Sequence, residues 1–195
     1  MTGTCEWNPM PHKVDVRCNN CRGLAVFEFA EVVKIDLKKD VPFFQESTLF
    51  EYHLLSDSCG HKWHGAFFFS GLHGSVKSIT ELPKGYAPEN WRHSKYLTRS
   101  HGIDLGSVSC QTCRTNKMHL LDWPNEAYYS IDYKSNQLWA FNRESANDLY
   151  SFIHGNERKV SDFKWRGFLL HIPTVFKTKK AREPITKKLN KLLSC

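Results

Sequence analysis

The chain has 195 residues, of which 41% are hydrophobic, 24% charged and 13% aromatic, and this composition excludes a largely disordered protein. Its start has neither a basic cluster nor an apolar segment, and its most apolar short stretch, residues 66–69, cannot span a bilayer, so we expect a cytoplasmic protein without a membrane partner. The net charge of +7 is uneven: residues 1–156 hold 16 Lys and Arg against 17 Asp and Glu, whereas residues 157–195 hold 11 against 3.

The first predicted element is a strand that leads into a cysteine knuckle. Val14 and Val16 alternate with polar residues, and the motif Cys18-Asn-Asn-Cys21 follows them. Two residues between cysteines allow both sulfurs of one tight turn to face a single metal ion. Gly23 can adopt the positive φ angle that closes such a turn, and an apolar strand then resumes.

A long segment separates this knuckle from the next pair of cysteines. Residues 24–37 are rich in Val, Phe and Ile and predict one or two strands. Residues 48–55 and 63–70 can pair as a hairpin around the Cys-Gly dipeptide between them. A shorter strand is expected over residues 76–82, and residues 83–107 have the Pro, Gly and Ser typical of loops, with room for one helical turn.

The second knuckle is Cys110-Gln-Thr-Cys113, again between apolar stretches. The chain has 7 cysteines, and an odd number fits a disulfide framework poorly. Two such knuckles complete a tetrahedral shell of four sulfurs, which suits Zn²⁺ or, less often, an iron–sulfur cluster. This strand–knuckle–strand pattern resembles the zinc-ribbon class, which implies a structural zinc ion held by Cys18, Cys21, Cys110 and Cys113, with residues 24–107 as an insertion.

A competing ligand set lies inside that insertion. Cys59, His61 and His64 are close in sequence and could complete a site with the first knuckle. The second knuckle would then need other ligands, with His101 and His119 as candidates, and the chain would hold two zinc ions.

The second half of the chain predicts a β-hairpin followed by a helix. Residues 127–133 and 137–141 flank a Lys-Ser-Asn turn. Asn142 can cap a helix that begins at Arg143, and Gly155 follows it as a natural C′ residue. One face of this helix carries apolar residues at helical spacing: Ala146, Leu149, Tyr150 and Ile153.

The C-terminal segment predicts a basic amphipathic helix over about residues 175–194. Pro184 should break or kink it, or begin a second helix. Its apolar stripe consists of Phe176, Ala181, Ile185, Leu189 and Leu192. Most of its lysines lie off this stripe and are the candidate phosphate contacts: Lys177, Lys179, Lys180, Lys187, Lys188 and Lys191.

Together these patterns predict an α+β fold. A β-rich zinc-ribbon-like core with an insertion should be followed by a β-hairpin–helix unit and a basic C-terminal helix. We expect the zinc-binding region to cover residues 1–121 and the α+β unit to cover residues 122–195.

The combination of a zinc knuckle and a basic end favours a nucleic-acid-binding protein. Two alternatives stay open at the level of sequence. One is a zinc-dependent interaction module that binds an acidic protein partner. The other is a metal-dependent enzyme that uses the His and Cys residues between positions 53 and 73. Because four cysteine ligands leave no open coordination position, the sequence favours binding over catalysis.

Overall fold

The computed structural model describes residues 10–57, 59–98 and 103–194. Helices and antiparallel strands are both well represented, which confirms the predicted α+β class. The chain divides into two compact units, residues 26–122 and residues 1–25 with 123–195, and the first boundary falls inside one strand. The expected division into a zinc-binding region, residues 1–121, and an α+β unit, residues 122–195, stays a prediction. Among the described residues no helix is both long enough and apolar enough to cross a bilayer.

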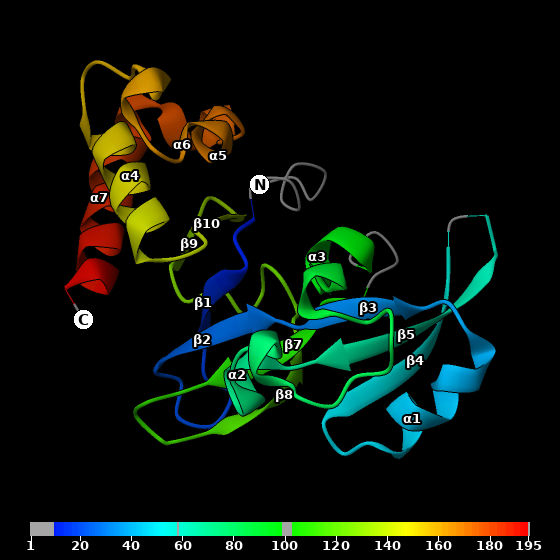
Figure 1. Ribbon diagram of the computed structural model, residues 1–195. Coiled ribbons are helices and arrows are strands. Elements are labelled where there is room, and N and C mark those ends of the chain that lie inside the picture. The colour runs from blue at the N-terminus through cyan, green and yellow to red at the C-terminus, as the bar shows by residue number, and fades with distance from the viewer. Residues whose placement is uncertain (1–9, 58, 99–102, 195) are drawn as a thin grey trace. The chain divides into compact units, whose positions relative to one another are not determined.

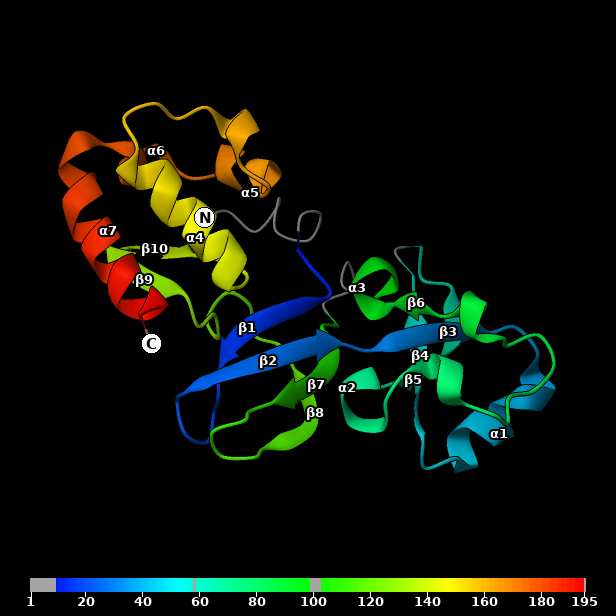
Figure 2. The ribbon, with the colours of Figure 1, turned by 60° about the vertical axis from the view of Figure 1, so that its left-hand side comes forward.

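The two knuckles join the strands of one four-stranded sheet. Its strands are β1 (Lys13–Arg17), β2 (Leu24–Phe29), β7 (Leu105–Ser109) and β8 (Asn116–Leu120), in that spatial order. Strands β2 and β7 are antiparallel, with Val26 opposite Ser109 and Phe29 opposite Gly106. Figure 2 shows β2 running beside β7, and β8 pairs with β7 in turn. The predicted ribbon-like core, interrupted by a long insertion, is therefore confirmed.

The insertion builds a second antiparallel sheet within unit 26–122 (Figure 1). In spatial order its strands are β4 (Phe50–Ser56), β5 (Lys62–Phe68), β3 (Glu31–Ile35) and β6 (Arg92–His93). The predicted hairpin is the β4–β5 pair, and Gly60 in its turn has a φ angle of 83°. Such an angle is unfavourable for residues with a Cβ atom, which explains glycine at this position.

Each face of this second sheet contributes to a hydrophobic cluster, since successive strand residues point to opposite sides. Ala66 and Phe68 join an aromatic cluster that includes Phe44 and Trp91, whereas Phe67 packs in a separate cluster with Val32. Phe44 comes from helix α1 (Val41–Glu46), which contacts β4.

Short helices connect these strands. They are η2 (Lys38–Asp40), α2 (Ser70–His73), η3 (Val76–Ser78), η4 (Pro88–Asn90) and α3 (Ser94–Leu97). The strand expected over residues 76–82 is wrong, since η3 occupies its start. The Ser75 side chain accepts a hydrogen bond from the Lys77 backbone N–H, and such local bonds compete with sheet formation.

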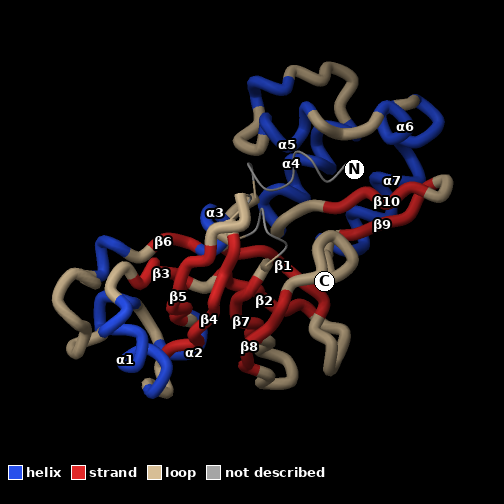
Figure 3. The backbone as a smooth tube through the Cα atoms, turned by 90° about the vertical axis from the view of Figure 1, so that its right-hand side faces the viewer, coloured by secondary structure: helices blue, strands red, loops and turns tan. Residues whose placement is uncertain are grey.

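The unit formed by residues 1–25 and 123–195 contains the predicted hairpin and helix (Figure 3). Strands β9 (Ser130–Tyr133) and β10 (Asn136–Trp139) are joined by Lys134 and Ser135, whose φ angles of 49° and 58° are typical of a tight hairpin turn. Helix α4 (Arg143–His154) begins as predicted, because Asn142 and Ser145 form a reciprocal capping box. Gly155 ends it, but with an extended conformation at φ −63° and ψ 150° instead of a left-handed one.

Further short helices, η6 (Val160–Asp162), α5 (Arg166–Leu170) and α6 (Thr174–Lys177), precede the basic helix α7 (Lys179–Leu193). The predicted break at Pro184 is wrong: the break lies at Thr178, which is extended with ψ 152°. Pro184 lies near the start of α7, where it removes a single hydrogen bond to the Lys180 carbonyl.

The apolar stripe of α7 packs on α4 and β9. Ala181, Ile185 and Leu189 are fully buried, as predicted. The stripe continues to Leu193 and leaves Leu192 half-buried, because Leu193 follows Leu189 by four residues on the same face.

Candidate metal centre

The two knuckles have the same backbone geometry. Each is a six-residue connection between antiparallel strands, residues 18–23 and residues 110–115. In each, the N–H of the first cysteine donates to a carbonyl five residues later, Cys18 to Gly23 and Cys110 to Thr115, at 2.8 Å in both cases. Two segments far apart in sequence therefore fold into one repeated local structure.

The residue after the second cysteine closes each turn. Arg22 has a φ angle of 63° and Arg114 one of 57°. The prediction that Gly23 adopts this conformation is wrong by one residue. Non-glycine residues adopt positive φ infrequently, so its repetition at equivalent positions indicates a specific knuckle geometry. Both arginines are exposed and place positive charge beside the cysteines.

Strand pairing brings the knuckles to the same end of the sheet. The first knuckle leads into the start of β2, and the second follows the end of β7. Since β2 and β7 are antiparallel and Val26 lies opposite Ser109, the start of one strand lies beside the end of the other. The sheet register therefore juxtaposes the two cysteine pairs.

The sulfurs of Cys18, Cys21, Cys110 and Cys113 all lie within 4.8 Å of one another. A tetrahedral zinc site with Zn–S bonds of about 2.3 Å requires sulfurs about 3.8 Å apart, so this arrangement fits such an ion. Cys18 and Cys110 are buried, and the Cys113 sulfur lies 3.0 Å from the Thr115 hydroxyl. The donor set, four soft sulfurs, is compatible with zinc or an iron–sulfur centre.

The competing ligand set lies elsewhere in the fold. Cys59 and His61 belong to the β4–β5 turn, where their N–H groups both donate to Asp57. His64 lies in β5, and its Nδ1 is 2.7 Å from the Tyr52 hydroxyl. Asp57, Cys59 and His61 could themselves approach one ion, but this group excludes the knuckle cysteines. His101 lies outside the described residues, and the His119 ring packs against Phe27.

The histidines expected to support catalysis are not gathered into one site. In the β4–β5 register, His53 lies opposite Gly65 and Leu54 lies opposite His64. Because neighbouring strand positions alternate in direction, His53 and His64 project from opposite faces of the sheet. The His53 ring packs on Phe67, and His73 lies beside Phe68. Among the described residues, no candidate metal group includes His53, His64 or His73.

The predicted phosphate-binding lysines lie on the last two helices. Lys177 is the half-buried last residue of α6. The other five are exposed on α7: Lys179, Lys180, Lys187, Lys188 and Lys191. Lys188 donates to the backbone carbonyl of Asp132 at 2.7 Å, so the hairpin holds this side chain in place.

A pair of arginines near this surface was not predicted from the sequence. Arg158 donates to the Lys177 carbonyl, and Arg182 donates to the Asn156 side chain at 2.7 Å. Burial lowers the pKa of Arg158, and the nearby charge of Arg182 lowers it further. Neither guanidinium has a carboxylate partner among the described residues. The two residues lie 24 positions apart, and the sequence pattern gives no signal of their proximity.

Comparison with protein-family models, curated proteins and solved structures finds no match for this chain. Function is therefore inferred from the residues and their geometry. Two features carry chemical information here: four sulfurs that can share an ion, and a cationic surface with few acidic residues.

Proposed function

We propose that this is a zinc-stabilised nucleic-acid-binding protein that contacts phosphates through its basic C-terminal end. The observation that carries the proposal is the two-sided character of α7. Its apolar stripe is buried against α4 and β9, so its lysines are held on the outer side of a docked helix. A fixed row of cations suits a polyanion, because each phosphate neutralised releases bound counterions.

The arginine pair supports the same reading. Two neighbouring guanidiniums repel each other, and no carboxylate among the described residues compensates Arg158 or Arg182. Guanidinium groups form strong paired hydrogen bonds with phosphate oxygens. A bound phosphate backbone would therefore relieve an electrostatic cost that the folded chain otherwise carries.

Zinc has a structural role in this proposal. Four cysteine ligands would leave the ion no open position for substrate or water, so the metal would supply folding energy instead of Lewis-acid chemistry. It would hold the start of β2 and the end of β7 together.

The proposal is tested by removing charge from α7 while a matched variant removes the same charge elsewhere. The test variant is Lys179→Gln, Lys180→Gln and Lys187→Gln; the control is Lys34→Gln, Lys38→Gln and Lys39→Gln, at exposed positions of the other unit. Fluorescence anisotropy would follow binding to several unrelated oligonucleotides at a series of salt concentrations.

We expect the wild type and the control to bind with similar, strongly salt-dependent affinity. The α7 variant should bind more weakly, and the slope of log affinity against log salt should shrink by about 2 to 3, since each phosphate contact contributes roughly 0.9 in duplex DNA. An equal loss of oligonucleotide affinity in both variants would show that only the net charge of the protein matters, which would refute a specific role for α7. Unchanged affinity in the α7 variant would also refute the proposal.

A protein partner is the second candidate, and one observation favours it. Val26, Met118 and Leu120 are 37%, 48% and 58% exposed. The register places all three on the same face of the knuckle sheet, since Val26 lies opposite Ser109, Met118 opposite Ser107 and Leu120 opposite Leu105. Binding to a protein that survives the α7 substitutions but is lost with Met118→Ser and Leu120→Ser would select this alternative.

A further inference from the structure

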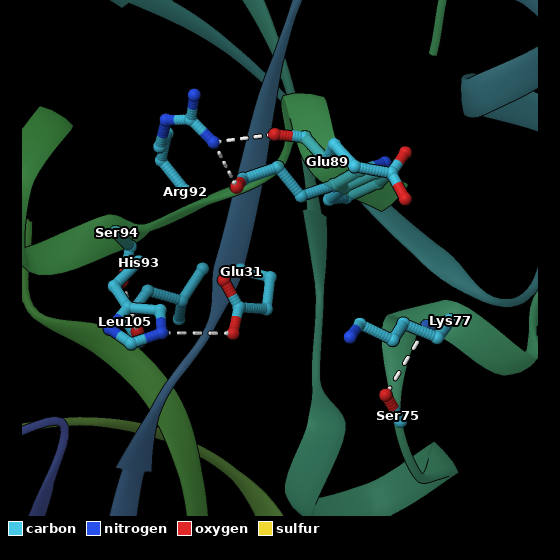
Figure 4. Close-up of polar contacts among 9 residues, drawn as sticks. Glu31, Ser75, Lys77, Glu89, Arg92, His93, Ser94 and Leu105 are labelled. Atoms are coloured by element: carbon cyan, nitrogen blue, oxygen red, sulfur yellow. Dashed lines mark hydrogen bonds and ion pairs between the residues drawn. The ribbon is translucent and has the colours of Figure 1, made fainter. Parts of the chain in front are cut away.

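Unit 26–122 contains an open pocket of about 380 Å³, whose lining includes none of the knuckle cysteines and no residue of α7. Strands β3 and β6 and the short helices η3 and η4 contribute its walls. Its polar lining residues include Tyr96 and, as labelled in Figure 4, Glu31, Ser75, Lys77, Arg92 and His93. This volume lies within the range of pockets that bind small molecules.

Hydrogen bonds fix the Arg92 guanidinium at the pocket without neutralising it. Its Nη1 donates to the backbone carbonyls of Glu89 at 2.5 Å and Trp91 at 3.1 Å (Figure 4). Among the described residues Arg92 has no carboxylate partner. Since carbonyl oxygens carry no net charge, a full positive charge is held in one orientation with donors to spare.

Lys77 supplies a second uncompensated charge. It is exposed, it has no carboxylate partner among the described residues, and in Figure 4 its ammonium group points from η3 toward Glu31. The hydroxyl of Ser75 accepts the Lys77 backbone N–H at 3.3 Å, which leaves its own hydrogen available for donation.

Among the described residues, Glu31 is the only carboxylate that lines this pocket, and it already has His93 as a partner. Glu31 lies opposite His93 in the β3–β6 register, and its Oε1 is 3.3 Å from the His93 Nε2. The Tyr96 ring stacks on the His93 ring, with the two ring centroids 6.0 Å apart and the ring planes inclined by 15°. Glu31 is thus positioned by His93, while Lys77 and Arg92 give the pocket an excess of positive charge.

We propose that this pocket binds the phosphate group of a small phosphorylated molecule. Arg92 and Lys77 would contact the phosphate oxygens, and Ser75 would donate a hydrogen bond to one of them. Cationic and neutral donors of this kind are the usual partners of phosphate. A concave pocket suits a terminal phosphate on a small ligand, whereas the α7 surface presents an extended row of charges. This site is therefore distinct from the one in the proposed function.

The test is a binding measurement by titration calorimetry with four probes: inorganic phosphate, a nucleoside 5′-monophosphate, a sugar phosphate and the unphosphorylated nucleoside. Variants Lys77→Gln and Arg92→Gln probe the pocket. Lys84→Gln is the matched control, because Lys84 is an exposed residue of the same unit that does not line the pocket. Circular dichroism would show that each variant is folded.

We expect the wild type and the Lys84 variant to bind phosphorylated probes and not the nucleoside, with a loss of about tenfold or more in the Lys77 variant, as for the removal of a charged hydrogen bond. Equal affinity for all three phosphorylated probes would support recognition of phosphate itself, and a preference among them would support the proposal and give the ligand class.

Two results would overturn the proposal. The first is no binding of any phosphorylated probe by folded wild-type protein. The second is binding that persists in the Lys77 and Arg92 variants but disappears with the triple α7 variant, which would assign the phosphate to the C-terminal surface. Oligonucleotide binding measured on the same proteins keeps the two proposals distinguishable, since the pocket variants should leave it unchanged.

Discussion

Replacement of Gly106 by alanine should disrupt the pairing that juxtaposes the two knuckles. Gly106 lies in β7 opposite Phe29. A Cβ atom added there would come within 2.5 and 2.8 Å of two ring carbons of Phe27 and would also collide with the backbone carbonyl of Glu28. Phe27 is fully buried, and the carbonyl belongs to the neighbouring strand, so neither can move aside without shifting β2.

The magnitude follows from the cost of overpacking. One extra carbon in a well-packed core lowers the free energy of unfolding by about 1–3 kcal/mol. The clash with the backbone places Gly106→Ala at the upper end of this range, at about 3 kcal/mol. For a chain of this size that corresponds to a fall in melting temperature of about 6–12 °C. Because the same strands position the cysteines, the variant should also release metal faster to a chelator.

Gly167→Ala is the matched control. Gly167 lies in α5, and an added Cβ there would meet nothing within 4 Å. Alanine is favoured over glycine in a helix by about 0.5–1 kcal/mol, so this variant should be as stable as the wild type or slightly more so. Thermal and denaturant unfolding followed by circular dichroism would measure both. A Gly106→Ala protein as stable as the wild type would refute the argument that this backbone approach is tight.

Two further predictions concern the metal and pH. Elemental analysis should find one zinc ion per chain, which is lost with Cys110→Ser and retained with Cys59→Ser. Removal of the metal should unfold the knuckle sheet. Two metal ions per chain, or loss of the metal with Cys59→Ser, would contradict the four-cysteine site. Burial raises the pKa of Asp15 above 3.8, although its carboxylate accepts a hydrogen bond from the Arg143 N–H at 2.9 Å. The Asp15 carboxyl therefore ionises at a lower pH in the unfolded chain than in the folded protein. As a result, the free energy of unfolding falls as pH rises from 3.8 to the raised pKa. Asp15→Asn should therefore gain stability relative to the wild type across that interval and keep a constant advantage at neutral pH; unfolding free energies measured over a pH series would show an unchanging difference if this reasoning were wrong.

Features determined by neighbouring residues could be predicted from the sequence. The cap at Asn142 needs only a side chain three residues from its partner, and the hairpins need only alternation and a turn. The cysteine grouping was also predictable, because each knuckle is a local motif and a metal requires both. The α+β class follows from these elements.

Features that depend on register or on distant packing could not be predicted. His53 and His64 are near in sequence, yet strand alternation separates them, and only the β4–β5 register reveals this. Pro184 was expected to break a helix, but the break at Thr178 left the proline close to a helix start, where it costs one hydrogen bond. The pocket that Lys77 and Arg92 line combines β3, η3, η4 and β6, short segments with no common sequence motif.

The separation of the two knuckles affects how the chain is made. The first cysteine pair is complete 89 residues before Cys110 is synthesised. At translation rates of about 5–20 residues per second, it would wait roughly 4–18 s for its partners. During that interval the nascent chain offers two thiols that can bind metal incompletely or be oxidised. Low availability of zinc during synthesis should therefore reduce the yield of folded protein more than the same shortage imposed after folding.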